Sequence, residues 1–253
     1  MKSMMKRQGF TLVELSLSLV FIGVLSIIIV LIINNTVMAY QRGVVLNQIN
    51  TVGMDLVDDM RAAVQGSPAL DNKCGDDSEC VSFTYKGTKI INNAEKNDVP
   101  LYGGVCTGRY TYIWKSGYLS DNDEMVKVNG EEFRLAKIKD NKRELCAKYM
   151  SMNDSEKNGV NFEIGDEGRE ELLAEENGLV LYDLHASKPA ISTATGSAYY
   201  SVSFILGTKE GGADITATGD YCVPPKDANS NFNYCAINKF SFAAQAGGIK
   251  NEE

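Results

Sequence analysis

The sequence predicts an α+β protein in which a long N-terminal helix carries a head built on an antiparallel β-sheet. Three observations support this fold class. An apolar run covers residues 10–33, a stripe of apolar residues with helical spacing follows it, and alternating apolar and polar segments occur in the rest of the chain. Because an apolar stripe indicates a helix and strict alternation indicates a strand, we expect the chain to change from helix to sheet after residue 66.

The apolar run has the length of a membrane-spanning helix. Its 24 residues would measure about 36 Å as a helix, against a hydrocarbon core of about 30 Å. Its single charge is Glu14, and a carboxylate inside a bilayer costs about 2.5–3.5 kcal/mol unless a partner offsets the cost. Basic residues precede the run, so the positive-inside rule predicts a cytoplasmic N-terminus and places the chain after about residue 40 outside. These basic residues are Lys2, Lys6 and Arg7.

The helix is expected to continue beyond the membrane as far as Gln65. Apolar residues recur every three or four positions over residues 40–65, which is the pattern of an amphipathic helix. They are Val45, Ile49, Val52, Leu56, Met60 and Ala63. The tripeptide Gly-Ser-Pro at residues 66–68 then supplies a stop signal.

Residues 9–14, GFTLVE, follow a short basic segment and resemble the processing site of type IV pilins and type II secretion pseudopilins. The resemblance implies that a membrane peptidase cuts between Gly9 and Phe10 and methylates the new amine of Phe10. It also implies that Glu14 neutralises the terminal amine of a neighbouring subunit during filament assembly. Because Glu14 lies one helical turn from Phe10, the carboxylate can alternatively pair with the amine of its own chain.

This resemblance divides the chain into four parts. They are a leader that is removed (1–9), a transmembrane or filament-core helix (10–33), its amphipathic continuation (34–66) and an extracellular globular head (67–253). The implied function is that of a structural subunit, a minor or specialised pilin, serving adhesion, twitching motility or DNA uptake. Two alternatives stay open: a pseudopilin of a type II secretion or competence system, and a membrane-anchored binding protein or sensor that does not polymerise.

The same resemblance implies where the protein is found and what it meets. It predicts insertion in the inner membrane as a single-pass protein, followed by transfer to an extracellular pilus. The implied partners are other pilin subunits, the prepilin peptidase, the inner-membrane assembly platform, membrane lipid before assembly, and a surface or host-cell ligand of the head.

Alternating segments predict six strands in the head, over residues 81–85, 109–114, 132–138, 179–184, 199–206 and 236–242. A short helix is expected over residues 166–176, because acidic residues begin it and Gly178 follows its end. Turn-rich sequence over residues 92–98 is expected to form a joint. The sheet is expected to pack against the amphipathic part of the long helix.

Six cysteines lie on the side of the membrane that we expect to be exported. An even number in an oxidising compartment predicts three disulfides, although six cysteines permit 15 connectivities. Sequence proximity favours a bond between Cys222 and Cys235. Two further pairs then follow by elimination, Cys74 with Cys80 and Cys106 with Cys146.

The sequence predicts neither an enzyme nor a metal or cofactor site. Its one histidine, His185, cannot build a two-histidine metal site, and the cysteines form no CxxC pair. A lone histidine also argues against a Ser-His-Asp triad, so we expect His185 to be a hydrogen-bonded structural residue. The net charge of −8 argues against nonspecific nucleic-acid binding.

Overall fold

The computed structural model describes residues 11–67, 81–91, 94–119, 126–140, 144–153, 155–164, 168–173, 178–187, 190–191, 198–209, 222 and 235–246. Within these residues the chain forms two helices and eleven strands. In chain order the elements are α1 (Leu12–Gln65), β1 (Ser82–Ile91), β2 (Ala94–Cys106), β3 (Tyr110–Lys115), β4 (Val126–Val128), β5 (Leu135–Lys139), α2 (Glu144–Ser151), β6 (Val160–Phe162), β7 (Arg169–Glu171), β8 (Leu179–Ala186), β9 (Ala190–Ile191), β10 (Ala198–Thr208) and β11 (Ile237–Ala246).

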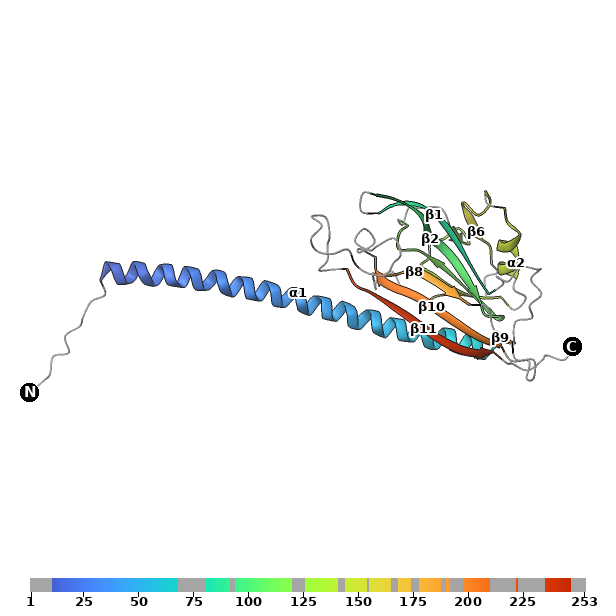
Figure 1. Ribbon diagram of the computed structural model, residues 1–253, viewed down its shortest axis with the longest axis horizontal. Helices are drawn as coiled ribbons and strands as arrows, with labels where there is room; N and C mark the ends of the chain where they lie inside the picture. The colour runs from blue at the N-terminus through green and yellow to red at the C-terminus, as the bar shows by residue number, and fades with distance from the viewer. Residues whose placement is uncertain are drawn as a thin grey trace, which may run out of the picture.

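Helix α1 is a stalk that extends well beyond the head (Figure 1). Its 54 residues measure about 81 Å. The N-terminal half of α1 projects away from the rest of the molecule, whereas the C-terminal half lies beside β11 and β10 (Figure 1). The long N-terminal helix and the antiparallel sheets that the sequence predicts are therefore confirmed, and with them an α+β architecture.

The head contains more than the one sheet that the sequence predicts. One sheet has five antiparallel strands in the order β1-β2-β3-β5-β7, and a second has the order β11-β10-β8 with β9 paired to β10. Strands β4 and β6 form a separate parallel pair. The two larger sheets meet where β2 contacts β8. This arrangement produces two main apolar clusters, one towards α1 and one towards α2.

The C-terminal half of α1 shares one apolar cluster with β10 and β11. Its buried members on α1 include Ile49, Leu56, Met60 and Val64, and those on the strands include Phe204, Phe240 and Phe242. Polar contacts also join α1 to β11. Asn238 donates to the side-chain oxygen of Asn50 at 2.7 Å, and the guanidinium of Arg61 lies 5.5 Å from the ring centroid of Phe242. Strand β11 therefore runs along α1 in the same direction as the helix.

Close approach of α1 to β11 depends on Gly53, and this leads to a first prediction. A methyl group on Gly53 would overlap the ring of Phe240, which stacks on Phe204 at 5.1 Å. We expect Gly53→Ala to lower the free energy of unfolding by up to about 2 kcal/mol, because overpacking costs about 1–3 kcal/mol and alanine regains about 1 kcal/mol of helix propensity.

Thermal unfolding of the detergent-solubilised chain would measure this effect. The matched control is Gly43→Ala in the same helix, because a methyl group there meets nothing within 4 Å. We expect the control to leave the midpoint unchanged or to raise it. If Gly53→Ala raised the midpoint of thermal unfolding as much as Gly43→Ala does, this would contradict the close packing of α1 on β11.

The helix predicted over residues 166–176 is wrong in the part that the structure describes. Residues 169–171 form β7, which pairs with β5. The carboxylate of Glu171 accepts the backbone N–H groups of Arg134 and Leu135, each at 2.9 Å. Helix propensity in so short a segment is a weak preference, and these long-range hydrogen bonds override it. The joint predicted over residues 92–98 is also too long, since β2 already begins at Ala94.

Two disulfides lie within the described residues of the head. Cys106 at the end of β2 is bonded to Cys146 in α2, with 6.6 Å between the Cα atoms. Cys222 is bonded to Cys235 just before β11, with 6.0 Å between the Cα atoms. The third pair that the sequence suggests, Cys74 with Cys80, lies outside the described residues.

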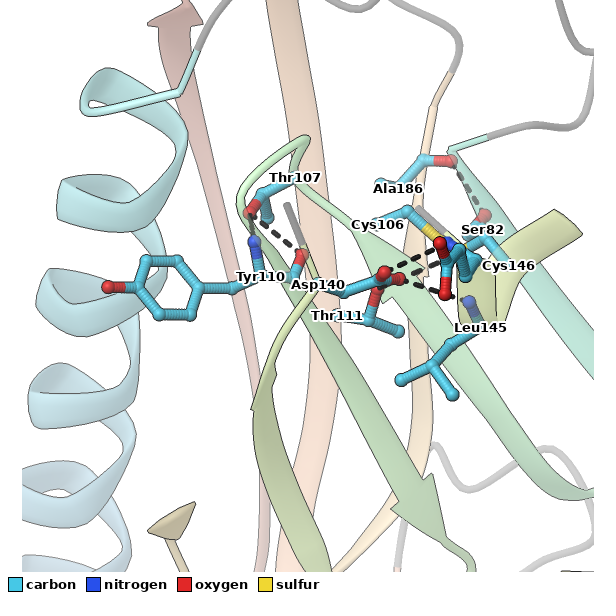
Figure 2. The surroundings of a disulfide bond; sticks show 10 residues. Ser82, Cys106, Thr107, Tyr110, Thr111, Asp140, Leu145, Cys146 and Ala186 are labelled. Carbon is cyan, nitrogen blue, oxygen red and sulfur yellow. Dashed lines mark hydrogen bonds between the residues drawn. A yellow bond between two sulfur atoms is a disulfide. The ribbon is translucent and has the colours of Figure 1, made fainter. Parts of the chain in front are cut away.

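Figure 2 shows how the first of these disulfides is positioned. Buried Asp140 accepts the backbone N–H groups of Glu144 at 2.8 Å and of Leu145 at 3.3 Å, at the start of α2. The hydroxyl of Thr111 on β3 also donates to Asp140, at 2.8 Å (Figure 2). Asp140 thereby satisfies free N–H groups at the start of α2 and holds the helix, with Cys146, against the first sheet.

Candidate assembly site on the N-terminal helix

The N-terminal half of α1 exposes an unusually large apolar surface. Large apolar side chains between Leu12 and Val37 are exposed by 42% to 85%, and they point in all directions around the helix. Soluble monomers rarely expose contiguous apolar patches of more than a few hundred square ångströms. Within the described part of the chain, α1 is the one helix long and apolar enough to cross a membrane. This surface is suited to apolar surroundings such as lipid or other helices.

The one charged group in this surface, Glu14, takes part in a capping box at the start of α1. Thr11 is the N-cap residue, and its hydroxyl accepts the backbone N–H of Glu14 at 3.3 Å. In return, Oε2 of Glu14 accepts the backbone N–H and the hydroxyl of Thr11, each at 2.9 Å. These bonds satisfy donors that a helix N-terminus otherwise leaves free, so the carboxylate has partners within its own chain.

The capping role of Thr11 was not predicted, although the pattern Thr-x-x-Glu before an apolar run is the signature of a capping box. Both hydrogen bonds from Thr11 go to Oε2, and a carboxylate has two oxygens with about four acceptor sites. Oε1 can therefore accept an ammonium proton while the cap stays intact. Gly9 and Phe10 lie outside the described residues, so cleavage between them and methylation of Phe10 stay predictions.

A second polar arrangement lies on the head, where three side chains follow the order of a Ser-His-Asp triad. Nδ1 of His185 lies 2.9 Å from the carboxylate of Asp183, and Nε2 lies 2.9 Å from the hydroxyl of Ser203. A Ser-His-Asp triad was not expected from the sequence, because the chain has a single histidine. Strand register brings the residues together, because His185 on β8 lies directly opposite Ser203 on β10.

Acyl-transfer chemistry needs more than three side chains in this order. Such a site requires N–H donors aimed at the developing oxyanion and a recess for the substrate. Ser203 lies in β10, which pairs with β8 on one side and β11 on the other, so its backbone belongs to the ladders. The geometry therefore corresponds to a hydrogen-bonded histidine on a sheet surface, with its side chain 51% exposed.

The array gives a second prediction. The hydrogen bond with Asp183 raises the pKa of His185 above its usual value, against the opposing effects of burial and of Lys239. We expect Asp183→Asn to lower the pKa of His185. NMR titration of the imidazole ring proton would measure this pKa, and the signal can be assigned without ambiguity because the chain has one histidine. Asp58→Asn on the exposed side of α1 is the control and should leave the pKa unchanged. An unchanged pKa in Asp183→Asn would contradict the hydrogen bond.

The raised pKa also fixes the sign of a pH effect on stability. The folded state holds the proton of His185 more tightly than the unfolded state does. This contribution is fully present below the unfolded pKa of about 6.5, and it is lost as the pH rises through the folded pKa. The effect should be small, because the imidazole is half exposed.

Comparisons with known proteins give no match: no family model fits the chain, and no curated protein or solved structure is significantly similar to it. Three features of the molecule bear on its function. They are the exposed apolar half of α1, the capped carboxylate in its first turn, and the head that the other half of α1 carries.

Proposed function

We propose that this protein is a structural subunit, a minor or specialised pilin, of a type IV pilus-like extracellular filament. The observation that carries the proposal is Glu14, the one charge in residues 10–33, placed in the first turn of a helix whose apolar surface is exposed. A simple membrane anchor needs only the apolar surface. A carboxylate retained there at a cost of about 2.5–3.5 kcal/mol fits a helix that must recognise another charged group.

In the proposed mechanism, subunits assemble when the apolar half of α1 leaves the lipid and joins a bundle of helices. Removal of residues 1–9 leaves the amine of Phe10 next to the capped Thr11, with the N-terminus cytoplasmic and the head outside. The apolar helices then move from lipid into a bundle, where Glu14 of one subunit pairs with the amine of Phe10 in the next. Because an unpaired charge inside an apolar bundle costs several kcal/mol, this pair selects one register between neighbouring helices.

The capping box supports this mechanism by orienting the carboxylate in advance. Thr11 holds Oε2 of Glu14 at the helix start. Oε1 can then accept a hydrogen bond from the protonated amine of the incoming subunit. The C-terminal half of α1 contributes by fixing the head on the stalk through the apolar cluster that it shares with β10 and β11. In the filament the heads would form the outer surface, and they would carry adhesion or another specialised role.

One observation favours a second function, that of a membrane-anchored binding protein that does not polymerise. Thr11 already gives Glu14 two hydrogen bonds within the chain, so a neighbouring amine is not required to satisfy the carboxylate. Under this alternative the N-terminal half of α1 would stay in lipid, and the head would act as a sensor or receptor on the outer side.

Cell fractionation separates the two functions. Filaments sheared from the host would be collected by sedimentation, and the chain would be quantified in the filament and membrane fractions. The filament proposal predicts the chain in both fractions, since subunits wait in the membrane before assembly. Detection in the membrane fraction alone would contradict the filament proposal and favour the anchored protein.

A further inference from the structure

Two Asn-Gly dipeptides lie in turns of the head within the described residues. They are Asn129-Gly130, directly after β4, and Asn158-Gly159, directly before β6. All four residues are exposed, and both glycines have a positive φ, 76° for Gly130 and 98° for Gly159. An Asn-Gly pair can react with itself, because glycine has no side chain to keep its backbone nitrogen away from the amide of the asparagine. Hydrogen bonds to the reacting groups then decide whether a given pair reacts.

The pair Asn129-Gly130 is held by hydrogen bonds on both reacting groups. The backbone N–H of Gly130 donates to Oδ1 of Asn161 at 2.9 Å, and Oδ1 of Asn129 accepts the backbone N–H of Ile164 at 2.7 Å. The backbone N–H of Asn129 also donates to the carbonyl of Phe162 at 2.9 Å. The attacking nitrogen and the amide that it would attack are therefore each bonded to another part of the chain, and these bonds must break before the two can meet.

The pair Asn158-Gly159 lies between two anchored neighbours. Before it, the carbonyl of Lys157 accepts the hydroxyl of Tyr102, and after it Val160 is buried as the first residue of β6. No group among the described residues forms a hydrogen bond with the side-chain amide of Asn158 or with the backbone N–H of Gly159. The same dipeptide thus occurs twice on the surface of the head, once with its reacting groups bonded and once without bonds to them from the described residues.

We propose that Asn158 is a site of spontaneous deamidation, which gives the head an additional negative charge as the protein ages. The backbone nitrogen of Gly159 loses its proton and attacks Cγ of Asn158, so that a nitrogen–carbon bond forms and closes a five-membered succinimide ring. The bond from Cγ to the side-chain nitrogen breaks, and this nitrogen takes up a proton and leaves as ammonia. Water then opens the ring at either carbonyl and leaves aspartate or isoaspartate. Water is the co-reactant, and nothing is oxidised or reduced.

The modification would change the turn more than the core of the head. The new carboxylate would follow Lys157, whose ammonium lies 5.3 Å from the ring centroid of Tyr149. Isoaspartate would also add a carbon to the backbone between Asn158 and Gly159, in the exposed link that precedes β6. This site lies within the head, and its reaction does not depend on filament assembly.

Incubation of the full chain in detergent and heavy-oxygen water, followed by tryptic digestion in ordinary water and mass spectrometry, tests the proposal. Only asparagines that react during the incubation acquire heavy oxygen, and trypsin places Asn129 and Asn158 on separate peptides because Lys157 lies between them. We expect Asn158 to react at least about tenfold faster than Asn129, since reaction at Asn129 must first break hydrogen bonds. The rate at Asn158 should rise with pH, because the attacking nitrogen must lose its proton.

Two variants and one change of conditions separate the effect of structure from that of sequence. Asn161→Ala removes the acceptor that holds the N–H of Gly130, so we expect faster reaction at Asn129 and an unchanged rate at Asn158. Asn158→Gln keeps an exposed amide but requires a larger ring, and it should abolish the gain of charge at residue 158. Equal thermal midpoints of the variants and the original chain would show that the fold is retained. In denaturant, where the hydrogen bonds are lost, the rates at the two asparagines should become similar.

Several results would overturn the proposal. They are the absence of heavy oxygen at Asn158 after incubation, equal rates at Asn158 and Asn129 in the folded chain, and a difference between the two rates that persists in denaturant. None of these results bears on the filament proposal, because that proposal concerns the N-terminal half of α1.

Discussion

Replacing Glu14 with alanine is expected to remove the protein from extracellular filaments while leaving it in the membrane. Without the carboxylate, the amine of Phe10 in the adjoining subunit would be buried in an apolar bundle with no counter-charge. Breaking a buried pair in this way costs about 3–5 kcal/mol, which corresponds to a loss of about 100-fold or more in incorporation. Quantitative immunoblotting of sheared filaments and of membranes would measure the ratio between the two fractions.

Two further variants separate the charge from the helix cap. Thr11→Ala removes the hydroxyl of the capping box but keeps the carboxylate of Glu14, so we expect a smaller loss of incorporation than with Glu14→Ala. Ser18→Ala removes a hydroxyl that bonds only to the backbone of Leu15, one turn further along, and it should incorporate normally. Normal incorporation of Glu14→Ala would contradict the assembly role and favour the anchored protein.

Replacing Asp59 with alanine is expected to lower the stability of the head by about 3 kcal/mol. The carboxylate of Asp59 on α1 lies 2.5 Å from Nζ of Lys137 and accepts the hydroxyl of Tyr112 at 2.8 Å. Burial, and then the nearby charge of Asp59, raises the pKa of Tyr112, so the hydroxyl stays protonated and donates. Alanine would leave a buried hydroxyl unpaired. It would leave Lys137, 14% exposed, with the more distant carboxylate of Glu170 at 3.8 Å and the ring of Tyr110 at 4.9 Å from its centroid.

The neighbouring residue provides a control for this effect. Asp58 pairs with Arg61 at 3.1 Å, but its side chain is 70% exposed, so Asp58→Ala should change stability by about 0.5 kcal/mol or less. Denaturant unfolding can be followed through the fluorescence of Trp114, which is the one tryptophan of the chain and is fully buried. Equal effects of the two variants would show that Asp59 does not join α1 to the first sheet.

The sequence predicts the helix well because the signals for α1 are local. The apolar run has the length of a membrane-spanning helix, the stripe that follows it has the period of a helix, and the stop signal at Gly66 agrees with the end of α1. The head is predicted less well, because its elements depend on contacts between distant residues. Helix α2 relies on Asp140 and on Cys106 from another element, and β7 relies on its pairing with β5.

The residues of the candidate site also differ in how far local sequence predicts them. Glu14 is found from the sequence because a charge in an apolar run is conspicuous, whereas the capping role of Thr11 was missed although the Thr-x-x-Glu pattern indicates it. The array of Asp183, His185 and Ser203 cannot be found this way, since the register of β8 against β10 brings His185 next to Ser203.

The N-terminus of the chain in sheared filaments is the most direct test of the proposal that this protein is a processed filament subunit. Mass spectrometry of the N-terminal peptide would identify the first residue and any modification of its amine. The proposal predicts that the chain begins at Phe10, that this amine is methylated, and that the processed form is present in filaments. A chain that keeps residues 1–9 and occurs only in the membrane would contradict it.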